Sequence, residues 1–108
     1  MGRTTREGIL VKYNQGDVIR VEGIKTPLLV VSRDFYNEDE QVITCPLVKQ
    51  CRVSVINVKV KFEGEDMFVL CDQIKQLDIN FRGSKKIGQI SVKDRMEVSD
   101  ILQGLFEY

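Results

Sequence analysis

The stretch VSVINVKVKFEGEDMFVLC, residues 53–71, has the clearest structural pattern in the sequence. Along residues 53–62, alternate positions place four apolar side chains on one face: Ile56, Val58, Val60 and Phe62. A period of two is typical of a strand with one buried face. The polar residues 63–66 predict a turn and the apolar run 67–71 predicts a second strand, so residues 53–71 are expected to form a β-hairpin.

Four further strands are predicted on the N-terminal side of this hairpin, at residues 8–12, 17–21, 28–32 and 41–47. Residues 17–21 alternate between two faces. Residues 28–32 and 41–47 are continuous apolar runs, which are typical of strands buried on both faces. Pro46 predicts a bulge or a sheet edge near the end of the second run. Residues 1–7 are polar and are expected to be disordered.

The C-terminal segment has the pattern of an amphipathic helix. Ser91, followed three residues later by Asp94, resembles a capping box. Apolar residues then recur at helical spacing: Met96, Val98, Ile101, Leu102, Leu105 and Phe106. We therefore predict a helix over residues 92–107, whose apolar stripe belongs to the core or to a dimer surface. About five or six short strands with this helix predict a mainly β (α+β) fold, a small curled antiparallel sheet covered by a helix.

The composition is that of one folded domain without a global electrostatic field. The 108 residues are 43% hydrophobic and 30% charged, which predicts a single domain over residues 1–108. Sixteen Lys and Arg balance sixteen Asp and Glu, so any binding of nucleic acid must use a local patch. The chain has no His, which excludes a Ser/His/Asp triad and a zinc hydrolase site, and no metal or cofactor is expected.

The three cysteines, Cys45, Cys51 and Cys71, are an odd number without CxxC spacing. Cys45 and Cys71 lie inside apolar runs, so we expect buried, reduced thiols. No apolar stretch reaches the length of a membrane span, and the N-terminus has no apolar signal segment. The sequence therefore predicts a cytoplasmic protein that does not enter a membrane.

Four blocks of sequence share their order and spacing with one known family. They are GDVI at residues 16–19, the segment from TPLLVVS at residues 26–32 to CPL at residues 45–47, VLCDQIKQLD at residues 69–78 and FRGSKKIGQI at residues 81–90. With the terminal helix they cover residues 16–106, nearly the whole chain. Together they resemble the MazF/PemK family of toxin-antitoxin growth inhibitors.

The resemblance implies a fold, an activity and partners. The fold would be an SH3-like small barrel, and the protein would be a homodimer whose subunits meet along a groove. The activity would be that of an mRNA interferase, a metal-independent endoribonuclease that binds and cuts single-stranded RNA. A cognate antitoxin peptide would neutralise the toxin by filling the groove.

Several positions depart from the family pattern where that pattern carries chemistry. Thr26 stands where the pattern has an Arg directly before the Pro of the second strand. Val48 stands where a Thr is expected, and Leu70 and Cys71 stand where some members have an Arg. Residues 22–26 replace a long, mobile loop. The sequence therefore leaves open whether the protein is an active enzyme.

The candidate site residues follow from the chemistry of metal-free RNA cleavage. This reaction needs a base for the 2′-hydroxyl proton and cations or N–H donors for the charge that develops on the phosphate. Asp72 and Gln73 match the family pattern, and Lys25 is a possible substitute for the missing Arg. The candidate catalytic residues are Asp72, Lys25 and Thr26. The candidate RNA-binding residues are Gln73, Lys75, Arg82, Lys85, Lys86 and Lys49.

Other interpretations stay open. Asp72 also fits a turn-forming residue at a strand end, and the basic residues 82–86 also fit a solvated turn. The whole protein could be a catalytically degenerate family member that serves as a dimeric binding module for a protein, RNA or operator DNA. It could also be a small barrel adaptor that binds protein partners through its sheet edges.

Overall fold

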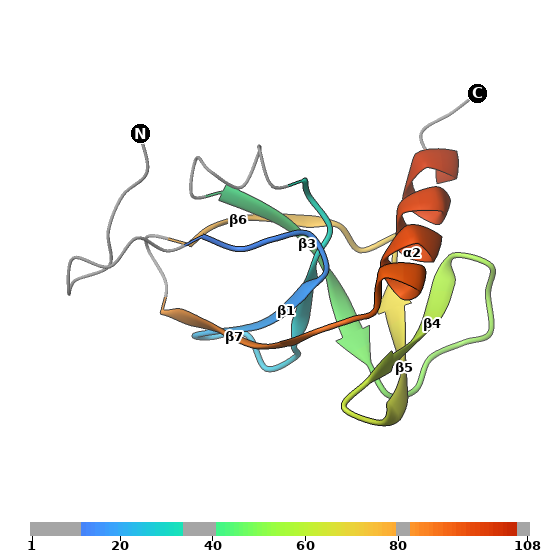
Figure 1. Ribbon diagram of the computed structural model, residues 1–108, viewed down its shortest axis with the longest axis horizontal. Helices are drawn as coiled ribbons and strands as arrows, with labels where there is room; N and C mark the ends of the chain where they lie inside the picture. Colours follow the sequence, from blue (N-terminus) through green and yellow to red (C-terminus); the bar gives the residue numbers. More distant parts are fainter. Residues whose placement is uncertain (1–11, 34–40, 80–82, 106–108) are drawn as a thin grey trace.

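The computed structural model describes residues 12–33, 41–79 and 83–105, which form seven strands and one helix (Figure 1). The elements are β1 Asp17–Val21, β2 Leu28–Val30, β3 Gln41–Val48, β4 Asn57–Phe62, β5 Glu65–Leu70, β6 Lys75–Asp78, β7 Ser84–Gln89 and α2 Val92–Leu105. The predicted strand at residues 8–12 lies outside the described residues except for Lys12, which is not in a strand. Residues 1–7 also lie outside them.

The strands form one curled antiparallel sheet in the order β4-β5-β3-β2-β1-β7, with β6 also paired to β3. The long strand β3 divides the sheet, because Gln41 to Thr44 pair with β6 while Leu47 and Val48 pair with β5. Figure 1 shows the β4–β5 hairpin directed away from β1 and β7, with α2 beside it. The predicted mainly β fold with a C-terminal helix is confirmed.

Pro46 lies at the point where β3 changes partners. Its register with Leu28 of β2 is regular, so the predicted bulge is absent and β3 is not an edge strand. Pairing with β6 ends at Thr44 and pairing with β5 begins at Leu47. Because Pro has no N–H, it is tolerated where no ladder hydrogen bond is required.

The predicted hairpin is confirmed, with narrower bounds. Phe62 pairs with Glu65, so the turn has two residues, Glu63 and Gly64, and both have positive φ (52° and 81°). Two positive φ values are the signature of a type I′ turn, which matches the twist of the flanking strands. The prediction was wrong for residues 53–56, which precede the first pair of the β4–β5 register and have no partner in it.

Five of the six predicted strands are present among the described residues, and two further strands that were not predicted bring the number there to seven. β6 (KQLD) and β7 (SKKIGQ) contain few apolar residues, and most of their side chains are exposed or half-buried. Their sequences therefore lack the apolar alternation that marks a strand. They form because β3 and β1 offer unpaired edges.

Each face of the sheet has its own apolar cluster. Strand β2 is buried on both faces, as predicted for residues 28–32: Leu29 belongs to one cluster, and Leu28 and Val30 belong to the other. The first cluster lies beneath the hairpin and helix and includes Val18, Cys45, Leu47, Val60, Phe62, Met67, Val69, Cys71 and Val98. The second includes Tyr13, Ile19, Val21, Val42, Leu77 and Ile79.

Helix α2 is anchored to the sheet at its first turn. The Asp94 amide donates to the Ser91 hydroxyl oxygen at 3.1 Å, which confirms the N-cap. The Asp94 carboxylate accepts a hydrogen bond from the main-chain amide of Lys61, in edge strand β4, at 2.9 Å. In a capping box it would accept one from the Ser91 amide instead. Val98 is buried, whereas Met96 is 60% exposed, so only part of the apolar stripe reaches the core.

Candidate functional site

Two grooves adjoin on the sheet and share Thr26 and Val48. The first, here called the Gln73 groove, has a volume of about 360 Å³ and is lined by Ile24, Thr26, Leu28, Thr44, Pro46, Val48, Leu70, Gln73, Ile74 and Lys75. The second, here called the Arg20 groove, has a volume of about 420 Å³ and is lined by Arg20, Lys25, Thr26, Pro27, Leu47, Val48, Lys49, Phe62, Glu63, Glu65, Met67 and Ile87.

The Gln73 groove brings together positions that are far apart in the sequence. Three of the departures from the family pattern, Thr26, Val48 and Leu70, line it, together with the candidate residues Gln73 and Lys75. The β2–β3 pairing and the end of β5 produce this proximity. Its surface is apolar apart from a few side chains that can donate or accept hydrogen bonds, which is typical of small ligand sites.

The Arg20 groove has cations on its rim above an apolar floor. Lys25, Lys49 and Arg20 contribute three positive charges. One of the two carboxylates that also line the groove, Glu65, lies 3.6 Å from the Lys49 ammonium, and both side chains are exposed. Such a surface can bind a chain molecule that carries several negative charges and planar apolar rings.

Arg20 was not among the predicted site residues. It is the one exposed position of β1, whose other four residues are buried. Its Nη1 donates to the main-chain oxygen of Lys25 at 3.1 Å, which holds the guanidinium at the start of the Thr26 segment. The alternation of residues 17–21 contained this signal, because Arg20 places a charge between the apolar residues Ile19 and Val21.

Asp72 lies in a tight turn directly after β5. The Gln73 amide donates to the Leu70 carbonyl at 3.1 Å across this turn, and Asp72 is exposed. Its neighbour Gln73 lines a groove, whereas Asp72 is not among the residues that line either one. The position is compatible with the turn-forming interpretation.

The thiols next to Asp72 are buried and protonated. Burial, with smaller contributions from the neighbouring Cys71 and from the Asp72 charge, raises the pKa of Cys45 to about 12. Burial also raises the pKa of Cys71 to about 11, again with a contribution from Asp72. Both side chains are fully buried and free, which confirms the expected buried, reduced thiols. They are packing groups, since the thiolate is the reactive form.

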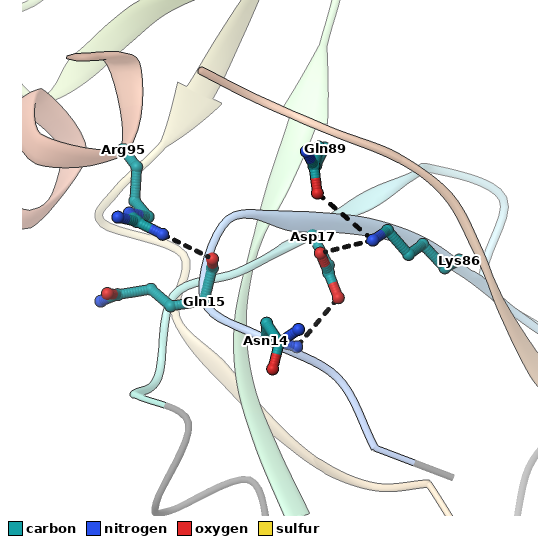
Figure 2. Close-up of polar contacts among 6 residues, drawn as sticks. All are labelled: Asn14, Gln15, Asp17, Lys86, Gln89 and Arg95. Carbon is teal, nitrogen blue, oxygen red and sulfur yellow. Dashed lines mark hydrogen bonds and ion pairs between the residues drawn. The ribbon is translucent and has the colours of Figure 1, made fainter. Parts of the chain in front are cut away.

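Lys86, which is exposed, forms an ion pair with a buried carboxylate outside both grooves (Figure 2). Its ammonium lies 3.2 Å from a carboxylate oxygen of Asp17, which is 2% exposed, and 3.3 Å from the Gln89 amide oxygen. The other Asp17 carboxylate oxygen accepts a hydrogen bond from the main-chain amide of Asn14 at 2.9 Å. Lys86 therefore compensates a buried charge and fixes the turn before β1.

The remaining basic candidates have different environments. Lys85 is exposed and lies opposite Arg20 in the β1–β7 register, which places a second cation beside that guanidinium. Arg82 lies outside the described residues. In the described part of the chain, no group of three or more Cys, Asp or Glu side chains is close enough to hold a metal ion. Over the same part, no helix is long and apolar enough to cross a membrane.

Comparison with known proteins identifies close structural similarity at low sequence identity. The MazE–MazF complex of Deinococcus radiodurans superposes with a TM-score of 0.77 and 21% identity, over 88% of this chain and 96% of that chain. An endoribonuclease in complex with its cognate antitoxin from a mycobacterial species gives a TM-score of 0.75 and 19% identity, over 89% and 98% of the two chains. These similarities establish the fold. No curated protein sequence matches the chain.

A family model adds evidence at the level of sequence. The model for PemK-like, MazF-like toxins of type II toxin-antitoxin systems matches residues 9–106, which include every residue of both grooves. The match extends over more than half of the chain and agrees with the fold. The chain therefore belongs to the family of PemK-like and MazF-like toxins of type II toxin-antitoxin systems.

Proposed function

We propose that this protein binds single-stranded RNA across the two grooves and cleaves it without a metal ion. The observation that carries the proposal is the junction at Thr26 and Val48, where a cationic groove meets a groove with hydrogen-bonding side chains. The membership of the family supports it. We propose messenger RNA as the substrate, and the proposed place of action is therefore the cytoplasm.

The two grooves offer different contacts to a nucleotide chain. Lys25, Lys49 and Arg20 would face phosphates, and the half-buried Pro27 and Ile87 in the same groove would contact a base. Across the junction, the amide of Gln73 can both donate to and accept from a base edge. Single-stranded RNA exposes both kinds of group, because its bases are not held in a duplex.

Cleavage would proceed through the 2′-hydroxyl of the RNA itself. Its oxygen attacks the adjacent phosphorus, the bond from phosphorus to the 5′-oxygen breaks, and the products are a 2′,3′-cyclic phosphate and a 5′-hydroxyl. The attacking hydroxyl loses a proton to a base and the leaving oxygen gains one. The candidates for this base are Asp72, which is next to Gln73 in the sequence but lies outside both grooves, and Glu63, which lines the Arg20 groove.

The test is incubation of the purified protein with a long single-stranded RNA in EDTA, with Asp72→Ala and Glu63→Gln variants alongside. We expect discrete fragments with 5′-hydroxyl ends, and at least a hundredfold slower cleavage for the variant that removes the base. Intact RNA with the wild-type protein would reject cleavage. Equal rates for all three proteins would reject both carboxylates as the base.

A second candidate function, RNA binding without cleavage, is favoured by a specific observation. Thr26 and Val48 replace an Arg and a Thr at the groove junction, and Asp72 does not line either groove. This alternative predicts that labelled RNA binds, as measured by fluorescence anisotropy, and is recovered intact. The cleavage experiment and the binding experiment together separate the two functions.

We also propose that the protein forms a homodimer and binds a cognate antitoxin. Val92 and Met96 lie one turn apart on α2 and are each 60% exposed, which supports contact with a second chain. Light scattering should give twice the chain mass of 12.4 kDa, and the single-chain mass would reject the dimer. An antitoxin that fills the grooves should compete with RNA in the anisotropy experiment, and simultaneous binding would reject that site.

A further inference from the structure

We propose that Arg20 is the residue that binds the RNA phosphate at the junction of the two grooves. This inference rests on the proposed RNA binding and names the group responsible for it. Thr26 at the junction offers only a hydroxyl, so the positive charge there must come from its neighbour Lys25 or from other segments. Arg20 reaches the same groove from β1, through a different part of the fold.

The position of Arg20 is fixed more firmly than that of a typical surface arginine. Its main chain belongs to β1, which is paired on both sides, with β2 and with β7. Its guanidinium donates to the Lys25 carbonyl oxygen at 3.1 Å, one residue before Thr26. A side chain held at both ends loses less conformational entropy when it binds a ligand.

Arg20 retains free hydrogen-bonding capacity. In the described part of the chain it forms no ion pair, whereas Lys49 is paired with Glu65 and Lys86 with Asp17. A guanidinium has five N–H donors, and the bond to the Lys25 oxygen uses one of them. The others can form the two parallel hydrogen bonds by which Arg binds a phosphate.

The charges around Arg20 favour an anion at this point. Lys25 lines the same groove, and Lys85 lies opposite Arg20 in the β1–β7 register. Like charges across a sheet repel each other, and a bound phosphate would relieve that repulsion. Two carboxylates, Glu63 and Glu65, also line this groove, and Glu65 is paired with Lys49, so three cations outnumber two carboxylates there although the net charge of the chain is zero.

The experiment measures the affinity for a fluorescein-labelled, single-stranded RNA by anisotropy at several salt concentrations. The main variant is Arg20→Gln, whose amide can still donate to the Lys25 oxygen but carries no charge. We expect about tenfold weaker binding and a salt-dependence slope reduced by about 0.7, the value for one phosphate contact in a single strand. Arg20→Lys should restore the slope but only part of the affinity.

The matched control is Lys93→Ala, which removes an exposed charge on α2 outside both grooves. It should leave affinity and slope unchanged. If the wild-type protein binds RNA and Arg20→Gln binds equally well with the same slope, the inference fails and the proposed function stands. If the wild-type protein does not bind RNA, both fail. Thermal unfolding of each variant checks that the fold is intact.

Discussion

Gly88 in β7 lies opposite Val18 and beneath the ring of Phe62. A Cβ atom at this position would lie 2.6 Å from the Phe62 Cε1 atom and 3.0 Å from its Cζ atom. Both distances are too short, and Phe62 belongs to a packed cluster, so its ring cannot move freely. We expect Gly88→Ala to lower the free energy of unfolding by about 1–3 kcal/mol, measured by urea denaturation.

Gly104 provides the control for this substitution. It lies in the last turn of α2 with no atom within 4 Å of an added Cβ. Alanine is favoured over glycine in helices, so Gly104→Ala should raise the free energy of unfolding by about 0.5 kcal/mol. Destabilisation of similar size at both glycines would show that contact with Phe62 is not the cause.

The sequence alone predicted some residues of the candidate site and missed others. Thr26, Val48 and Gln73 could be named because the family pattern assigns chemistry to their positions, and they line the grooves. Arg20 could not, because its relevance depends on a hydrogen bond to Lys25 that forms only in the folded chain. Lys86 looked like part of a basic cluster, yet its buried partner Asp17 is 69 residues away in sequence.

At the level of elements, one carboxylate of α2 adds a polar contact with β4 to the apolar packing between them. The Asp94 carboxylate accepts a hydrogen bond from the Lys61 main-chain amide at the edge of β4. The Asp94 main-chain amide donates to the Ser91 hydroxyl oxygen. Asp94→Ala leaves the Lys61 N–H without its charged acceptor. Because this bond is exposed and water can replace the carboxylate, we expect a loss of about 0.5–1.5 kcal/mol in the free energy of unfolding and faster hydrogen exchange at the Lys61 amide.

Two variants test this assignment. Asp94→Asn keeps an acceptor oxygen and should recover most of the stability. Asp100→Ala removes an exposed charge from the same helix, and should change the free energy of unfolding by less than about 0.5 kcal/mol. If Asp94→Ala and Asp100→Ala unfold at the same urea concentration, the Lys61 contact contributes nothing.

The elements that the sequence predicted share a strong local pattern. The β4–β5 hairpin alternates with a period of two and the helix with a period of 3.6, and each buries the predicted face in part. Strands β6 and β7 have no such pattern, because they are polar and form against existing edges. Their existence depends on tertiary pairing, which local sequence does not encode.

At the scale of the whole molecule, the grooves follow from the division of the sheet at β3. The strand pairs with β6 along its first half and with β5 at its end, so the two halves of the sheet diverge near Pro46. The Gln73 groove includes Pro46 and lies at this divergence. The sequence predicted a curled sheet, but the place of the division depends on which strands pair with β3.

Because two thiols are buried in the neutral form, the stability of the whole molecule is expected to decrease at high pH. In the unfolded chain a thiol has a pKa of 9.0, whereas burial raises the pKa of Cys45 to about 12 and that of Cys71 to about 11. Above pH 9 the unfolded chain releases protons that the folded chain keeps, so the free energy of unfolding falls as pH rises. The stability that these neutral thiols contribute is complete below pH 9 and is lost between about pH 9 and 12.

Urea denaturation at about pH 8 and pH 10 measures this loss, which we expect to reach about 2 kcal/mol for the two thiols. The control is the double variant Cys45→Ala and Cys71→Ala, which starts less stable but should lose much less between the two pH values. Burial also raises the pKa of Tyr13, and its contribution is present in both proteins and cancels in the comparison. An equal decrease in both proteins would mean that other groups cause the alkaline unfolding.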